Sequence, residues 1–254
     1  MKKTLAISNT IALIVTIAIN YLSNTGLING NTMKTISDRY ENYFTPAGYA
    51  FSIWGVIYLG LLGFIFYGWR TVADNNNKVL TKVGWWFIVS CVANSLWVVA
   101  WLYDQIGLSV AIMILLLLSL FKIIQNANIS GQGKADILTR LCVNWPFSIY
   151  FGWVSVALIA DVAAFLTKIG WDGWGISGLM WTIIMLCTAG LVNLLVVQVK
   201  KLYGYALVGI WAVLAISVAN QNAGSAIVYT CYGVAGIILV SIVFNLIKTR
   251  PIAG

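Results

Sequence analysis

The chain has 254 residues, of which 61% are hydrophobic and only 9% are charged, and its formal net charge is +8. Soluble domains carry roughly 25% charged residues, so the composition excludes a water-soluble globular protein and indicates an integral membrane protein. The Lys and Arg residues are scattered over several separate polar segments. A single basic run is therefore absent, and no nucleic-acid partner is expected.

Eight apolar stretches approach or exceed the length that a helix needs to cross a hydrocarbon core of ~30 Å. They lie at about 5–25, 48–68, 83–103, 105–121, 141–165, 175–197, 203–220 and 225–247. The stretches are continuous and do not alternate in short strand-length units, which favours helices over an outer-membrane barrel. The sequence predicts an all-α polytopic membrane helix bundle with about eight transmembrane helices, of which 203–220 has the weakest signal.

The positive charges are distributed unequally between the two sides that eight spans define. With the N-terminus inside, twelve Lys and Arg fall on the cytoplasmic side and three, Lys34, Arg39 and Lys168, fall outside. The cytoplasmic set is Lys2, Lys3, Arg70, Lys78, Lys82, Lys122, Lys134, Arg140, Lys200, Lys201, Lys248 and Arg250. The positive-inside rule therefore predicts that both termini are cytoplasmic. The apolar run at the N-terminus is long and lacks a clear cleavage site, so it is interpreted as a retained first helix.

The segment 26–47, between the first two apolar stretches, carries Asp38 and Glu41 and is expected on the external side. It is long enough to fold over the mouth of a helix bundle, and it is equally consistent with an ordinary solvated loop. The sequence leaves these two interpretations open.

Polar residues within the apolar stretches carry information because a buried polar group in lipid is costly. Asp161 is the only acidic residue within a stretch, and Asn94, Ser95, Asn193 and Asn220 are the clearest amides and hydroxyls. Interhelical hydrogen bonds would explain the amides. Asp161 is expected to face the bundle interior or an aqueous vestibule.

Aromatic residues form stripes at helical spacing. Phe51, Trp54 and Tyr58 share one face, as do Asn94, Trp97 and Trp101 on the third stretch and Trp145, Ile149 and Trp153 on the fifth. Such stripes usually pack in a core. When three helices each contribute one, with an amide and a carboxylate nearby, they also suit a pocket for a flat apolar ligand.

Three segments resemble the translocator protein family, the tryptophan-rich sensory proteins. WGVIYLGLLGFIFYGW (54–69) is similar to the second helix of that family, with its W-x-x-x-Y pattern. Residues 80–121 resemble the third and fourth helices, including Asn-x-x-Trp, and NWPFSIYFGWVSVALIADVAAFL (144–166) resembles the fifth, with Tyr-x-x-Trp-x-Ser-x-Ala. The chain departs from the family pattern at Tyr49, where relatives carry Trp, and at Asp161, where they carry Asn.

The resemblance implies a five-helix membrane bundle over residues 1–166. Residues 167–254 have no counterpart in the family pattern and are expected to form an additional three-helix membrane segment packed on it. The resemblance also implies a ligand pocket beneath segment 26–47, in a protein of the bacterial inner (plasma) membrane. The expected ligand-binding residues are Tyr49, Phe51, Trp54, Tyr58, Asn94, Trp97, Trp101, Trp145, Tyr150, Trp153 and Asp161.

These expectations predict a binding, sensory or transport protein that takes a planar hydrophobic ligand such as a porphyrin. The protein is expected to contact membrane lipids. The chain contains no histidine, which excludes a His-ligated haem, and no catalytic residue, metal site or cofactor is expected. The alternative is a proton-coupled transporter of a small amphipathic solute that uses Asp161. An enzymatic role is not expected, although the resemblance leaves porphyrin breakdown open. The last three helices are expected to cover a homodimer surface, to enlarge the pocket or to bind a partner.

Overall fold

The computed structural model describes residues 1–131, 135–223 and 225–248. All of the regular elements that it describes are helical. In chain order they are α1 (Lys2–Leu22), α2 (Met33–Arg39), η1 (Gly48–Ser52), α3 (Ile53–Thr71), α4 (Val79–Val83), α5 (Trp86–Leu102), α6 (Ile106–Asn126), α7 (Ile137–Thr139), η2 (Arg140–Asn144), α8 (Trp145–Lys168), η3 (Gly173–Gly175), α9 (Gly178–Lys200), α10 (Tyr203–Ala219) and α11 (Ser225–Lys248).

Each of the eight predicted stretches contains one apolar helix. Six of them, formed by α1, η1 with α3, α6, α7 to α8, α9 and α11, are long and apolar enough to cross a membrane, and α5 and α10 are shorter apolar helices. The 17 residues of α5 and of α10 extend about 25 Å at ~1.5 Å per residue, near the lower limit for crossing the hydrocarbon core. The protein is therefore an integral membrane helix bundle.

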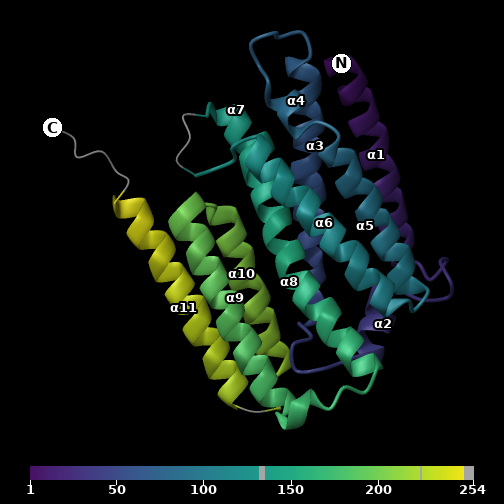
Figure 1. The fold of residues 1–254 in the computed structure, drawn as a ribbon, viewed down its shortest axis with the longest axis vertical. Helices are drawn as coiled ribbons and strands as arrows, with labels where there is room; N and C mark the ends of the chain where they lie inside the picture. Colours follow the sequence, from purple (N-terminus) through teal and green to yellow (C-terminus); the bar gives the residue numbers. More distant parts are fainter. Residues whose placement is uncertain (132–134, 224, 249–254) are drawn as a thin grey trace.

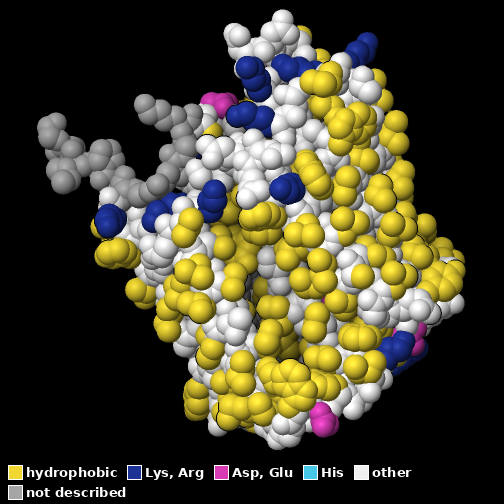
Figure 2. All heavy atoms as spheres, viewed as in Figure 1, with side chains coloured by type: hydrophobic (Ala, Val, Ile, Leu, Met, Phe, Trp, Pro, Cys, Tyr) yellow, Lys and Arg dark blue, Asp and Glu magenta, His cyan; other side chains and the backbone are white. Residues whose placement is uncertain are grey.

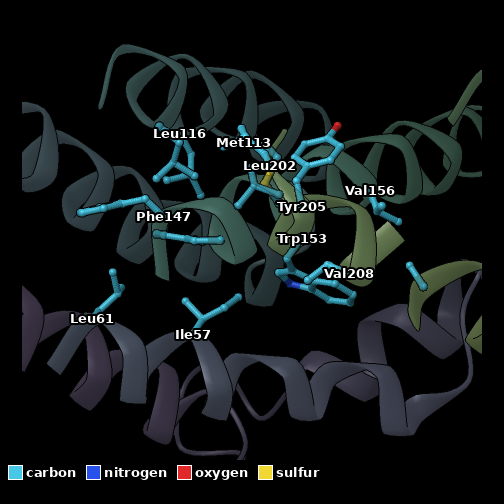
Figure 3. Close-up of a cluster of buried hydrophobic side chains, with 14 of the residues drawn as sticks. Ile57, Leu61, Met113, Leu116, Phe147, Trp153, Val156, Leu202, Tyr205 and Val208 are labelled. Atoms are coloured by element: carbon cyan, nitrogen blue, oxygen red, sulfur yellow. The ribbon is translucent and has the colours of Figure 1, made fainter. Parts of the chain in front are cut away.

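Five helices form a closed ring in which α1 packs on α5, α5 on α6, α6 on α8, α8 on α3 and α3 on α1. The last three helices attach to this ring through α10, which contacts α8 on one side and both α9 and α11 on the other (Figure 1). A cluster of buried apolar side chains extends from the ring interior to α10 (Figure 3). They come from α3, α6, α8 and α10 and include Ile57, Met113, Phe147, Val156 and Val208.

Close approach of α10 to α8 depends on Gly152. A Cβ atom at this position would lie 2.8 Å from the carbonyl oxygen of Tyr205 in α10, so only glycine allows the two backbones to meet. The first turn of α10 is also anchored on α8, because the backbone N–H of Tyr205 donates to Ser148 Oγ at 3.0 Å. This bond satisfies an N–H that has no partner within its own helix.

Hydrophobic side chains cover the middle of the molecular surface, and Lys and Arg gather mainly toward the end where the chain begins (Figure 2). The start of α1 and the end of α11 both point toward that end (Figure 1). Large apolar side chains stay exposed on the outer helices, including Ile14, Leu59, Leu118 and Val240, as lipid contact requires. Two of the predicted cytoplasmic cations, Lys134 and Arg250, lie outside the described residues. The assignment of this end to the cytoplasm stays a prediction.

Segment 26–47, called the lid from here on, folds over the opposite end of the ring. It contains α2, which begins with a reciprocal capping box between Thr32 and Thr35 and buries Ile36 completely. The amides of Asn29 and Asn31 both donate to the carbonyl of Leu102 at the end of α5, each at 3.0 Å. These contacts decide between the two interpretations of the segment, because a solvated loop would not be bound to a helix end in this way.

Asp104, in the turn between α5 and α6, binds the lid and the end of α8. Its carboxylate accepts a hydrogen bond from the Tyr40 hydroxyl at 2.8 Å and pairs with Arg39 and Lys168, both at 2.9 Å. Partial burial acts to raise the pKa of this carboxyl, but hydrogen bonds from Lys168, Tyr40 and Arg39 outweigh it and hold the pKa below its usual value. Asp104 thus stays charged at neutral pH and joins α2, the α5–α6 turn and the end of α8.

Candidate functional site

The predicted stripes of α3 and α5 meet inside the ring, with Trp54 at the centre, but of the stripe predicted on α8 only Trp153 joins them, because Trp145 and Ile149 lie against Gly204 of α10. The Trp54 ring stacks on Tyr58 with centroids 5.7 Å apart and lies 6.1 Å from Trp97 of α5. Tyr150 and Trp153 of α8 approach it edge-on at 5.8 and 6.3 Å. Phe51 and Trp101 extend this aromatic cluster, by contacts of 6.2 Å each to Trp153 and Trp97. These seven candidate residues therefore form one continuous group.

Asn94 connects the aromatic cluster to α1 by a chain of hydrogen bonds. Its amide nitrogen donates to the Tyr150 hydroxyl at 3.0 Å, and its oxygen accepts from the Asn20 amide at 2.7 Å. Asn94 is fully buried, so these bonds replace the water that its amide loses. The amide spans three helices and fixes α1, α5 and α8 relative to one another.

Asp161 lies in the ring interior, where it is 2% exposed. One carboxylate oxygen accepts from Ser109 Oγ of α6 at 2.7 Å, and the other accepts from Trp97 Nε1 at 3.2 Å. Asp161 has no ion-pair partner among the described residues. The structure thus places this carboxylate in the interior that the sequence predicted and supplies two neutral donors.

The space enclosed by the aromatic cluster is small. A central cavity of about 50 Å³ lies between the lid and the cluster, lined by residues that include Phe51, Trp54, Trp153 and Asp161. One water occupies roughly 30 Å³ in the liquid, so this space suits water and not a planar ligand. The lid closes it, and the indole N–H of Trp101 donates to the carbonyl of Met33 at 3.3 Å.

A larger cavity, of about 500 Å³, lies on the other side of the same aromatic residues, between α1 and α3. Phe51, Trp54 and Tyr58 line it from α3 and its entry turn. The facing side and the mouth are formed by α1, its C-terminal turn and the lid, through Ile17, Asn20, Tyr21, Ser23, Asn24, Met33 and Lys34. Cavities of roughly 300–1,000 Å³ accommodate drug-sized ligands, so this α1–α3 cavity has the size that the central one lacks.

Gly55 gives the α1–α3 cavity part of its room. It lines the cavity, and a Cβ atom built on it would meet nothing within 4 Å. The Tyr58 hydroxyl beside it is buried and faces the ring interior, near Asn94 and Cys91.

Two candidate residues lie apart from this group. Tyr49 is 43% exposed and packs edge-on against Trp211 of α10 at 5.1 Å, and Trp145 lies at the start of α8, beside Gly204. Neither residue lines the central cavity or the α1–α3 cavity. They support the attachment of α10 to the ring.

The sequence interpretation missed the contribution of α1. Asn20 and Asn24 line the α1–α3 cavity, and their separation of four residues places both on one helical face. The spacing was visible in the sequence. What identifies these residues is the hydrogen bond from Asn20 to Asn94, which depends on how α1 packs against α5.

A protein-family model described as TSPO-like protein matches residues 6–244. The match begins in α1 and ends in α11, so it includes the three helices beyond the segments that carry the translocator motifs. Neither a curated protein nor a solved structure shows detectable similarity to the chain. Since the family match covers most of the chain, this protein belongs to the TSPO-like family of membrane proteins.

Proposed function

We propose that the protein binds a planar hydrophobic ligand of the tetrapyrrole class in the α1–α3 cavity. The observation that carries the proposal is the cavity of about 500 Å³ whose one side is the Phe51–Trp54–Tyr58 stripe. Aromatic rings supply large apolar contact area and offset or edge-to-face stacking, which suits a flat conjugated ligand. The cluster behind them holds these rings in fixed orientations.

Polar groups at the mouth of the cavity suit the acidic substituents of such a ligand. Lys34 is the only charged residue among the described residues that line the cavity, and its side chain is 70% exposed and pairs with Asp38 on the next turn of α2. A surface pair of this kind is weak, so a ligand carboxylate can replace Asp38 as the partner of Lys34. Asn20 and Asn24 add amide donors on the α1 side.

Protoporphyrin IX, added to the protein in lipid nanodiscs, tests the proposal through quenching of Trp fluorescence. Gly55→Trp places a ring in the cavity without a clash at Cβ, and we expect at least a tenfold loss of affinity. Gly233→Trp is the matched control, because a Cβ at Gly233 of α11 also meets nothing within 4 Å and lies far from the cavity in sequence and packing. Equal affinities for the two variants would exclude the α1–α3 cavity as the site.

The role of Lys34 is tested with protoporphyrin IX and its uncharged dimethyl ester. Lys34→Gln should weaken binding of the acid several-fold and leave the ester unchanged, because only the acid offers a carboxylate to the ammonium group. A loss that is the same for both ligands would show that Lys34 contributes no charge recognition.

A further inference from the structure

A second and larger cavity, of about 1000 Å³, lies between α8 and α9. It extends from the apolar interior to the lid end of the molecule, where residues 41–45 cover it. The two cavities have no lining residue in common. The α8–α9 cavity is therefore a separate space, and about half of its lining comes from the chain that follows α8, in the turn of residues 169–177, α9 and the end of α10.

The cavity exists because α8 and α9, although adjacent in the chain, pack on a common neighbour. Helix α10 contacts both α8 and α9, and the turn of residues 169–177 bridges them at the lid end. The covering segment is fixed in place, since the Asn220 amide at the end of α10 donates to the Tyr43 carbonyl at 2.9 Å. Ordered structure thus covers the lid end of the cavity, while the cavity as a whole is partly open.

The interior of the α8–α9 cavity is apolar, and its mouth is aromatic. Leu158, Val162 and Leu166 of α8 face Met185 of α9 across it. At the mouth, Trp171 and Trp181 lie 5.3 Å apart, and the Trp181 indole N–H donates to the Gly173 carbonyl at 2.8 Å. These two rings line the cavity and are held in position.

The charged residues among the described residues that line this cavity are acidic. Glu41 and Asp172 line the cavity, and none of the lining residues is Lys or Arg, although the chain as a whole carries a net charge of +8. Neither carboxylate forms an ion pair with a residue that the structure describes. Asp172 only accepts a backbone hydrogen bond from Trp174 at 2.9 Å.

We propose that the α8–α9 cavity is a second binding site, which takes an amphipathic organic cation. The apolar body of the ligand lies between α8 and α9, and its cationic group lies at the mouth between Glu41, Asp172 and the Trp171 and Trp181 rings. Indole faces attract cations electrostatically, and the two carboxylates supply complementary charge. The opposite charge of Lys34 at the α1–α3 cavity predicts that the two sites select ligands of opposite sign.

Two probes of nearly equal shape and opposite charge separate this proposal from simple apolar partitioning. Tetraphenylphosphonium and tetraphenylborate are each equilibrated with the protein in lipid nanodiscs, with empty nanodiscs as the background. We expect saturable binding of the phosphonium at one site and at least tenfold weaker binding of the borate. Equal binding of both ions, or binding no greater than to empty nanodiscs, would overturn the proposal.

Variants locate the bound cation. Ala163→Phe fills the cavity lined by Ala163, and Ala111→Phe adds the same ring to the exposed face of α6. We expect at least a tenfold loss of phosphonium affinity in the first and none in the second. Unchanged affinity in Ala163→Phe would place the cation elsewhere and refute the site.

Neutral replacements of the carboxylates provide a test that does not depend on repacking. Glu41→Gln and Asp172→Asn should each weaken phosphonium binding about threefold or more, while Asp74→Asn, with the same change in net charge at a distant loop, should not. Asn at 172 can still accept the bond from the Trp174 N–H. Protoporphyrin binding is measured on every variant, so that failure of the second site and failure of the proposed function are separate outcomes.

Discussion

Substitution of Gly152 by alanine tests the junction between the five-helix ring and the last three helices. The new Cβ would lie 2.8 Å from the Tyr205 carbonyl oxygen and 2.9 Å from its Cα, whereas ordinary contact begins at 3.4 Å. Both neighbouring atoms belong to the backbone and cannot rotate away, so α10 has to move about half an ångström in a close-packed interior. The same movement stretches the bond between the Tyr205 N–H and Ser148.

The expected magnitude follows from three contributions. Overpacking costs about 1–3 kcal/mol, and weakening the Tyr205–Ser148 bond costs about 1 kcal/mol. Alanine regains about 1 kcal/mol of helix propensity relative to glycine. The net loss is therefore about 1–3 kcal/mol, which corresponds to a fall of several degrees in Tm for a chain of this size.

Thermal unfolding of the purified protein, followed by circular dichroism in one detergent, measures this effect. Gly233→Ala is the control, because a Cβ at Gly233 meets nothing within 4 Å. The higher helix propensity of alanine should leave the Tm of this variant equal to that of the wild type or slightly above it. A Tm for Gly152→Ala that equals or exceeds that of the control would refute the close approach of α8 and α10.

Three further predictions concern polar contacts between elements of the fold. Asp104→Asn should make the lid more accessible to protease at neutral pH. Because folding lowers the pKa of Asp104, its contribution to the stability of the lid is present above the unfolded pKa and is lost as the pH falls through the folded pKa. The protease sensitivity of the wild type should therefore approach that of the variant in acid. A difference that stays constant with pH would contradict this mechanism. Asn94→Ala should lower stability by about 1–3 kcal/mol, because it removes the bond to the Tyr150 hydroxyl and leaves the Asn20 amide with only its bond to the Thr16 carbonyl. A change below the error of thermal unfolding would contradict this role. Asp161→Leu should lower Tm more than Asp161→Asn, since only asparagine retains an acceptor for one of the two donors, and the reverse order would show that the donor contacts contribute little.

Several features of the fold were predictable because they depend on local composition. Continuous apolar stretches place helices wherever the bilayer leaves no water to satisfy backbone groups, and all eight predicted stretches contain a helix. The Trp54–Tyr58 and Asn94–Trp97 spacings placed their side chains on single helical faces, and these faces meet in the aromatic cluster. Helical periodicity was sufficient to identify them.

The position of the ligand-sized space was not predictable in the same way. The aromatic side chains of α3, α5 and α8 pack against one another and enclose only about 50 Å³, while the space of about 500 Å³ opens on the α1 side of the Trp54 stripe. Which face of the Trp54 side chain borders a cavity depends on the packing of α1, a helix without an aromatic stripe. Tyr49 illustrates the same point, because it contacts Trp211, a residue 162 positions later in the chain.

The sequence by itself determined that this protein is a membrane helix bundle of the TSPO-like family, because hydropathy, helical spacing and family motifs are properties of short segments. Only the tertiary structure decided that the lid closes over the ring, that Asp161 meets Ser109 and Trp97, and that α8 and α9 diverge around a cavity with an acidic mouth. These features arise from contacts between residues far apart in the chain. Such contacts depend on how helices cross and on which small residues, such as Gly152, let them approach.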